Sequence, residues 1–336
     1  QEDVVLNGHA IEVRYYAEDP DEDFLPSTGP IYLWSPAEGE GLRVDSGIAT
    51  GGEVSPFYDS MVAKIIAHGS TRDEARRRLI RGLENTALFG PRTNRDFLIN
   101  ALGQKTFAAG AATTAFIEET YGETGYRSDA PGPELLAIAA VIQHRLARDT
   151  ASADAVGVSP ELLDWSSAAD LETERLYSVD DESRRISVRP TKKDCYSVSV
   201  DDSSVSVEIL KLHDLHARLL VNGNVRMTRF CQPDSATLDF SVGDRTISVR
   251  DLSRGLAAED EVSGGGTVVS PMHGLLLELF VAEGDQVRKG DKLAVLESMK
   301  MQHEIVAEVD GKVTSVAAST QTQLAAEDLI LEIEPA

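Results

Sequence analysis

Lys300 is the residue of this chain whose type and setting most directly suggest chemistry, because it lies between Met299 and Met301 at the centre of a repeated segment. Placing Gly274 over Gly311 aligns the two halves of that segment. The other residues that then match are Leu276 with Val313, Leu279 with Val316, Val287 with Leu324, Asp291 with Asp328, Leu296 with Ile333, and Glu297 with Glu334. A two-fold β-domain would present the connection between its halves as a hairpin, so we expect the amine of Lys300 on an exposed turn.

A lysine on a turn is usually only a solvated surface residue, but a Met-Lys-Met turn midway through a small duplicated β-domain is much rarer. From Thr267 to Pro335 the sequence resembles the biotin carboxyl carrier domains. That resemblance implies covalent biotin on Lys300, and a biotin protein ligase that recognises Met299 and Met301. An anchor of this kind must be exposed, rigidly presented and carried on a mobile body, because tethering makes each delivery an intramolecular event.

The segment departs from the carrier family at a few positions. Ser298 replaces the usual Ala, Gln302 replaces a frequent Glu, and residues 270–274 read Ser-Pro-Met-His-Gly instead of Ser-Pro-Met-Pro-Gly. None of these changes removes the acceptor amine. A lipoyl group is the alternative modification, but lipoyl domains usually carry their lysine beside acidic residues and without the methionine pair.

Short blocks near the start of the chain resemble the C-terminal subdomain of biotin carboxylase. They are Gly8–Arg14, Ala17–Pro20, Phe24–Ser27, Tyr58–Met61 with Lys64, and Thr93–Asn94. The resemblance implies that Arg14 is a catalytic guanidinium near bicarbonate, where it stabilises the biotin enolate. A fixed cation at the point where negative charge develops is an effective catalytic device. The alternative for Arg14 is an ion pair on the surface of a strand.

The same resemblance sets expectations for the rest of a carboxylase. We expect the part that uses ATP, bicarbonate and Mg or Mn to precede Gln1. Arg43 corresponds to an arginine near the carboxylase dimer contact, and Glu40 stands where the homodimeric bacterial enzyme has an aromatic residue. This difference argues against such a homodimer.

The N-terminal third predicts a mixed α/β subdomain. Alternation over Ala10–Tyr15 predicts a strand, and Thr71 with Glu74 predicts a capping box that opens a helix stopped by Gly90-Pro91. A second helix is expected from Thr93 as N-cap to Gly103, and a third over Thr114–Tyr121.

The middle third predicts one buried helix and several strands. Glu134–Arg148 is apolar around much of its circumference, and such a helix must be buried on most sides. Seven strands are expected: Ile186–Arg189, Tyr196–Val200, Val205–Leu210, Ala217–Val221, Val225–Phe230, Thr237–Val242 and Thr246–Asp251. We therefore expect a barrel or strongly bent sheet around the helix.

This pattern resembles the BT domain of propionyl-CoA and methylcrotonyl-CoA carboxylase α-subunits, which docks the carboxyltransferase. Leu212 and Leu215, in an expected loop near Lys211–Leu215, are the candidate contact residues. His213 and His216 have a metal-like spacing but no third ligand, so no metal site is expected.

The fold class is thus multidomain α+β. The resemblances imply a biotin carboxylase C-terminal subdomain (1–122), a BT-like β-barrel around a central helix (123–255), a Gly-rich flexible linker (256–266) and a flattened all-β biotinyl-type barrel (267–336). The net charge of −24 over 336 residues argues against nucleic-acid and membrane-surface binding, since both require a basic surface. No apolar run reaches the roughly 18 residues of a membrane span. We expect a cytoplasmic or mitochondrial-matrix location.

The leading functional hypothesis is a biotin-dependent acyl-CoA carboxylase, of which this chain supplies the carrier and part of the biotin carboxylase. The acyl-CoA would bind the carboxyltransferase partner, whose pocket would select it. One alternative is a non-catalytic carrier and scaffold fragment. Another is a pyruvate- or urea-type carboxylase, but residues 123–255 leave no room for the additional catalytic domain that such an enzyme needs.

Overall fold

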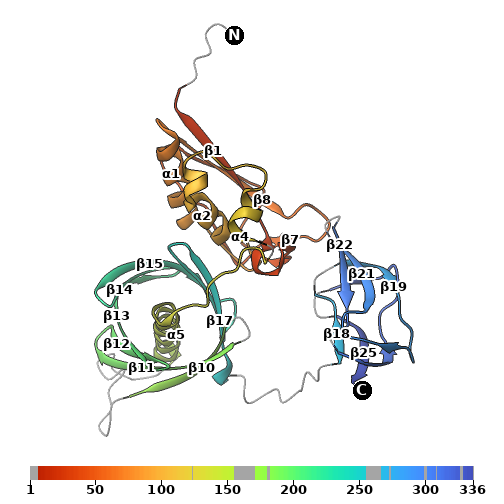
Figure 1. Ribbon diagram of the computed structural model, residues 1–336. Coiled ribbons are helices and arrows are strands. Elements are labelled where there is room, and N and C mark those ends of the chain that lie inside the picture. The colour runs from red at the N-terminus through yellow and green to blue at the C-terminus, as the bar shows by residue number, and fades with distance from the viewer. Residues whose placement is uncertain are drawn as a thin grey trace.

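The computed structural model describes residues 7–122, 124–154, 171–179, 182–254, 266–271, 274–298, 301–307, 309–325 and 328–335. Three bodies with separate hydrophobic cores follow one another along the chain (Figure 1). The predicted linker at 256–266 lies almost entirely outside the described residues and stays a prediction.

The N-terminal body is built on a three-stranded antiparallel sheet in the order β1 (His9–Tyr16), β8 (Met61–Gly69), β6 (Leu42–Ser46). Successive strand residues point to opposite faces. Val13, Tyr15 and Ile65 therefore share a core with residues of helix α1 (Arg72–Glu84), while Arg14 lies on the exposed face.

Shorter elements complete this body. They are β2 (Glu18–Asp19), the 3-10 helix η1 (Pro20–Glu22), β3 (Leu25–Pro26), β4 (Gly29–Pro30), β5 (Leu33–Ser35), β7 (Glu53–Val54), β9 (Ala87–Phe89), α2 (Arg95–Gly103), α3 (Lys105–Ala108) and α4 (Phe116–Tyr121).

The predicted start of the first helix is confirmed, but its end is not. The Thr71 hydroxyl accepts from the backbone N–H of Glu74 at 3.2 Å, whereas the Glu74 carboxylate accepts from the backbone N–H of Ser70 at 2.8 Å. The helix ends at Glu84 rather than at Gly90-Pro91, because the unpredicted strand β9 follows it and pairs with β5.

The predicted N-cap of the second helix was wrong by one residue. Asn94, not Thr93, precedes α2, and its side-chain oxygen accepts from the backbone N–H of Tyr16 at 3.0 Å instead of capping the helix. The hydroxyl groups of Thr93 and Tyr15 are hydrogen-bonded to each other at 3.2 Å. Both side chains are hydrogen-bonded to residues of β1, so neither caps the helix.

The middle body is a closed antiparallel barrel of eight strands, β10 to β17, each paired with its neighbours in chain order. The strands are β10 (Thr173–Val179), β11 (Glu182–Lys192), β12 (Cys195–Val200), β13 (Ser203–His213), β14 (His216–Val221), β15 (Asn224–Cys231), β16 (Thr237–Val242) and β17 (Arg245–Asp251), followed by the 3-10 helix η3 (Leu252–Arg254).

The predicted count of seven strands was therefore wrong, because β10 was missed. Only Tyr177 and Val179 are buried apolar residues on that strand. The third buried position is Arg175, which is ion-paired with Asp251 on β17. A charged residue at an inward position weakens the alternation by which strands are recognised.

Helix α5 (Pro133–Asp154) runs through the barrel, and the strands encircle it in Figure 1. Its residues Leu136–Ile142 share one core with inward residues of the strands, including Val198 and Leu219. Gln143 is the polar exception, and it is satisfied: it donates to the Ala236 carbonyl at 2.9 Å and accepts from the Tyr177 hydroxyl.

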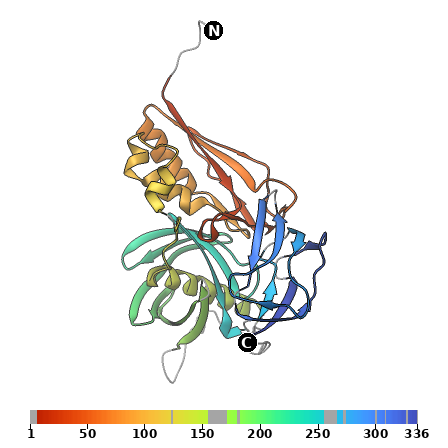
Figure 2. The same cartoon turned by 45° about the vertical axis from the view of Figure 1, so that its right-hand side comes forward.

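The C-terminal body consists of two four-stranded sheets, in the orders β18-β25-β23-β20 and β22-β21-β19-β24. Their strands are β18 (Thr267–Val269), β19 (Gly274–Leu279), β20 (Gln286–Val287), β21 (Lys292–Ser298), β22 (Met301–Val306), β23 (Gly311–Val316), β24 (Gln323–Leu324) and β25 (Leu329–Pro335). Leu25 of the N-terminal body packs against this core, and Figure 2 shows the sheets beside the other two bodies.

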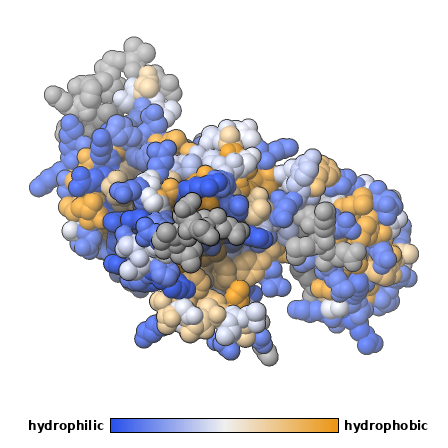
Figure 3. All heavy atoms as spheres, turned by 90° about the horizontal axis from the view of Figure 1, so that it is seen from above, coloured by the Kyte–Doolittle hydropathy of each residue, from blue (hydrophilic) through white to orange (hydrophobic). Residues whose placement is uncertain are grey.

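The outer surface is mostly hydrophilic in the view of Figure 3, with hydrophobic residues in separate patches. Within the part of the chain that the structure describes, no helix is long and apolar enough to cross a membrane.

Candidate functional site

The repeat seen in the sequence is a structural two-fold in the C-terminal body. Strands β19, β20 and β21 of the first half correspond to β23, β24 and β25 of the second half. The two sheets have the same strand order when β18 is matched with β22, so each sheet contains strands of both halves. The predicted duplication is confirmed in the backbone.

The two aligned glycines have the same packing requirement. A Cβ at Gly274 would lie 2.8 Å from the carbonyl oxygen of Glu297, and a Cβ at Gly311 would clash with the carbonyl oxygen of Glu334. Real Cβ atoms essentially never come so close, so each half needs glycine at the start of its first strand, where that strand pairs with its last.

The aligned aspartates also play equivalent roles. Asp291 accepts from the backbone N–H of Arg288 at 2.8 Å, and Asp328 accepts from the backbone N–H of Ala325 at 2.7 Å. Each carboxylate closes the turn that leads into the last strand of its half. Local side-chain bonds of this kind make Asp favourable in turns.

The hairpin that joins the halves is formed by β21 and β22. Their register runs from Lys292 opposite Val306 to Ser298 opposite Met301. Leu296 and Ile305 point from these strands into the core, which fixes the base of the hairpin. Met299 and Lys300, and the side chain of Met301, lie outside the described residues.

The other lysines of the carrier sheets differ from Lys300 in their position. Lys292 is bound at the far end of β21, where its ammonium contacts Glu304 at 2.6 Å and lies 5.0 Å from the centre of the Phe280 ring. Lys289 and Lys312 lie before β21 and on β23, respectively. None of the three is in the turn between the halves.

Arg14 lies on the exposed face of the N-terminal sheet, in a row of charged residues. It is opposite Lys64 on β8, which in turn is opposite Asp45 on β6. Tyr16 raises the pKa of Arg14, with smaller contributions from the carboxylates of Glu12 and Asp59. Arg14 makes no ion pair with any residue that the structure describes, so the cation is not neutralised on its strand.

The sequence blocks that resemble biotin carboxylase come together around the end of β1. The Asn94 side chain donates to the Arg14 carbonyl at 3.2 Å and accepts from the Tyr16 N–H, which fixes the backbone on both sides of Tyr15. The Ser60 hydroxyl donates to the Glu18 carboxylate at 2.6 Å. Burial raises the pKa of Glu18, and this hydrogen bond opposes the effect. These hydrogen bonds between the blocks were not predicted from the sequence.

His213 and His216 face each other across the turn between β13 and β14. Among the described residues, no group of three His, Cys, Asp or Glu side chains is placed to hold a metal ion.

Two families match separate parts of the chain. Residues 12–119 match the family described as biotin carboxylase C-terminal domain, and residues 266–333 match the family described as biotin-requiring enzyme. The chain therefore contains a biotin carboxylase C-terminal domain and a carrier domain of biotin-dependent carboxylases. Both predictions from the sequence are confirmed at that level.

Full-length relatives extend the similarity across the middle body. The chain is 30% identical over 359 residues to mitochondrial methylcrotonoyl-CoA carboxylase subunit alpha of Mus musculus, covering 99% of this chain and 48% of the relative. It is also 30% identical over 355 residues to the mitochondrial propionyl-CoA carboxylase alpha chain of Homo sapiens, covering 99% and 47%. The chain thus spans about half the length of the curated relatives that it matches.

Among solved structures, the biotin carboxylase subunit of pyruvate carboxylase is 44% identical over an aligned region that covers 38% of this chain and 28% of that chain, with a TM-score of 0.36.

Proposed function

We propose that this chain supplies the biotin carrier and part of the biotin carboxylase of a biotin-dependent acyl-CoA carboxylase, with Lys300 as the biotin acceptor. The observation that carries this proposal is the register of β21 and β22, which ends at Ser298 opposite Met301 and leaves only Met299 and Lys300 between the strands. Biotin, when attached, carries an activated carboxyl group between two active sites.

The chain's own residues supply an anchor for that group. Leu296 and Ile305 hold the two strands on the core, so the strands that precede and follow the acceptor lysine are fixed. Met299 and Met301 flank the amine and would be read by the biotin protein ligase. Gly274 keeps β19 close to β21, which supports the hairpin from the neighbouring strand.

Arg14 is the proposed catalytic cation of the carboxylase portion. Its guanidinium lies on an exposed sheet face, and Asn94 fixes the strand that carries it. A pre-positioned cation stabilises developing negative charge without reorganisation at the moment of reaction. ATP, bicarbonate and Mg or Mn would be used by the complete biotin carboxylase domain.

The eight-stranded barrel is the proposed docking body for the carboxyltransferase partner, at whose site the acyl-CoA would bind. The sequence suggested Leu212 and Leu215 as contact residues in a loop, but β13 continues to His213 and Leu212 packs against the barrel core. Leu210 and Leu215 are exposed leucines near the β13–β14 turn, with 42% and 38% of their surface accessible.

Mass spectrometry of the intact chain after co-expression with an active biotin ligase tests the assignment of Lys300. The parent chain should gain the mass of one biotin, and Lys300→Arg should gain none and lose streptavidin binding. Lys289→Arg is the matched control, and it should be biotinylated like the parent. Biotin on the Lys300→Arg chain would refute the assignment.

A further inference from the structure

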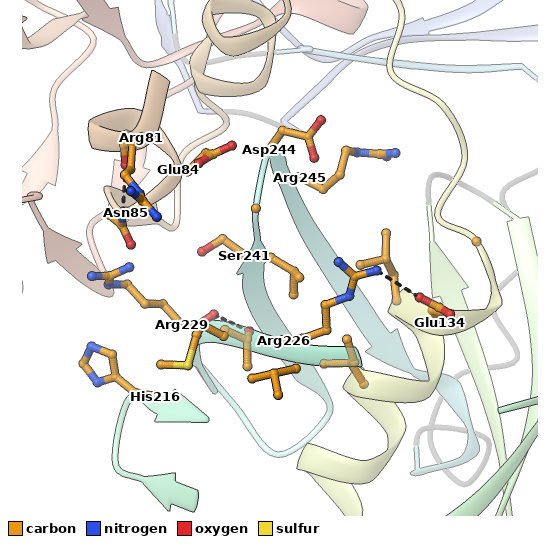
Figure 4. Close-up of a pocket in the computed structure, with 18 of the residues that line it drawn as sticks. Arg81, Glu84, Asn85, Glu134, His216, Arg226, Arg229, Ser241, Asp244 and Arg245 are labelled. Atoms are coloured by element: carbon orange, nitrogen blue, oxygen red, sulfur yellow. Dashed lines mark hydrogen bonds and ion pairs between the residues drawn. The ribbon is translucent and has the colours of Figure 1, made fainter. Parts of the chain in front are cut away.

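A cavity of about 710 Å³ lies at the junction of the N-terminal body and the barrel. Its walls are the C-terminal end of α1, the outer face of β15 with the β16–β17 hairpin, and the N-terminal end of α5 (Figure 4). This volume is typical of pockets for small molecules, which measure roughly 300–1,000 Å³. Neither the biotin hairpin nor the face that carries Arg14 contributes to the lining.

Four arginines line the cavity, and two of them already have partners. Arg226 contacts the Glu134 carboxylate at 3.4 Å, and Arg245 donates to the Asp129 carbonyl. The side chains of Arg81 and Arg229 make no hydrogen bond or ion pair with the residues that the structure describes. Both lie on the same side of the cavity in Figure 4, next to Asn85 and His216.

Arg229 carries positive charge into a partly buried place. Its guanidinium Nε is buried and has no hydrogen-bond partner among the described residues. Burial and the nearby charge of Arg95 lower the pKa of Arg229. His216 lies opposite Arg229 in the β14–β15 register, and burial followed by the Arg229 charge lowers its pKa as well. A partly buried cation without a counter-ion is unfavourable, so the side of the cavity that carries Arg229 favours an anion.

Apolar residues continue from the cationic side of the cavity. Val225 and Met227 precede Arg229 at alternate positions of β15, so all three lie on the outer face of that strand. Val225 is 49% exposed and Met227 is 61% exposed. Leu135 at the start of α5 is partly exposed and adds apolar surface to the lining. A ligand that fits both parts has a charged head and a short hydrocarbon body.

Arg95 joins two walls of the cavity, although it is not part of the lining itself. Its guanidinium donates to the carbonyls of Glu84, at 3.2 Å, and of Gly243, and both residues line the cavity. One buried side chain thus joins the helix wall to the barrel wall. The cavity is preformed, which lowers the entropic cost of binding.

We propose that this cavity is a binding site for a small amphipathic oxyanion, whose phosphate or carboxylate group lies between Arg81 and Arg229 and whose apolar body lies along Val225 and Met227. Arginine suits such a ligand because its planar fork donates two parallel hydrogen bonds to an oxyanion. The site is separate from the proposed biotin chemistry and does not depend on it.

Calorimetric titration of the whole chain with hexyl phosphate, hexanoate and inorganic phosphate tests the proposal. Hexyl phosphate or hexanoate should bind at one saturable site, more tightly than inorganic phosphate, and the tighter of the two identifies the head group. Arg229→Gln and Arg81→Gln should each weaken that binding about tenfold or more, the loss expected for a charge-assisted hydrogen bond. Arg229→Lys should retain part of it, because the charge remains.

Arg250→Gln is the matched control, since Arg250 is an exposed arginine on β17 outside the cavity. It should bind hexyl phosphate and hexanoate like the parent chain, and circular dichroism should show that all variants are folded. The proposal is overturned if neither amphiphile gives saturable binding, if Arg229→Gln binds as well as the parent, or if Arg250→Gln loses as much affinity.

Discussion

Asp96 accepts two hydrogen bonds from Thr246, one from the backbone N–H at 2.7 Å and one from the hydroxyl at 3.0 Å. The first residue belongs to helix α2 and the second to strand β17 of the barrel. Arg95 reinforces this contact, because it pairs with Asp96 at 2.7 Å and donates to Thr246 at 2.9 Å. The N-terminal body and the barrel are therefore joined by a buried polar cluster.

Replacing Arg95 with Met should destabilise the chain strongly, because it removes the cation from a buried pair and leaves Asp96 uncompensated. Breaking a buried pair in this way typically costs about 3–5 kcal/mol. Chemical denaturation measures the loss. Arg77→Met is the control, since Arg77 pairs with Asp73 on the exposed surface of α1, where such pairs contribute about 1 kcal/mol or less. Similar losses in both variants would show that Arg95 does not join the two bodies.

Replacing Gly274 with Ala should disturb the hairpin without touching the acceptor. The new Cβ would lie 2.7 Å from Leu296 and 2.8 Å from the Glu297 carbonyl, so β21 must shift. Overpacking of this kind costs about 1–3 kcal/mol. The rate of biotinylation by the ligase should fall, and the fall is read from a streptavidin blot over time. Gly39→Ala, which has no neighbour within 4 Å, should be biotinylated at the parent rate. An unchanged rate in Gly274→Ala would contradict the proposed support of the hairpin.

Replacing Arg14 with Ala in a complete carboxylase that contains this chain should slow biotin carboxylation by about 100-fold or more, the size expected for a lost preorganised electrostatic contact. ATP affinity should stay the same, because the lost interaction is with charge that develops during the reaction. Steady-state kinetics of bicarbonate-dependent ATP cleavage separates the two effects. Arg43→Ala is a suitable comparison, since Arg43 is on the same sheet face but is paired with Asp45 at 2.8 Å. Normal turnover of the Arg14 variant would make this arginine structural.

The carrier domain could be predicted from the sequence because the matching residues of its two halves each meet a requirement of the nearby backbone. Gly274 and Gly311 are required by the close approach of a paired strand, and Asp291 and Asp328 close turns within three residues of themselves. Such requirements are local, so they leave a signature at fixed spacing in the chain.

The features that sequence analysis missed depend on distant partners. Arg175 faces inward on β10 only because Asp251 lies beside it in the closed barrel. Asn94 does not cap α2, because its side-chain oxygen accepts a hydrogen bond from the backbone of β1 instead. Arg229 resembles any strand arginine in sequence, and only the fold places it without a counter-ion beside α1. The roles of such residues can be inferred only from the folded structure, where their distant partners are known.

The proposed docking role of the barrel can be tested at its exposed leucines. Leu210 and Leu215 lie near the β13–β14 turn, while the adjacent Leu212 packs against the core, so charged residues at the first two positions should spare the barrel. The double variant Leu210→Asp/Leu215→Asp should lose co-purification with the carboxyltransferase partner from a lysate that contains it. Buried apolar anchors commonly contribute about 2 kcal/mol or more each to an interface, and two such losses weaken binding by several hundredfold.

Biotinylation of the double variant should remain at the parent level, because the carrier sheets and their core are separate from the barrel. Leu171→Asp serves as the control, since Leu171 is an exposed leucine just before β10, and β11 and β12 separate β10 from β13 in the barrel. It should co-purify with the partner like the parent chain. If the double variant binds the carboxyltransferase as tightly as the parent, this end of the barrel is not the contact surface. If Leu171→Asp loses the partner as well, the effect of the double variant is not specific to Leu210 and Leu215.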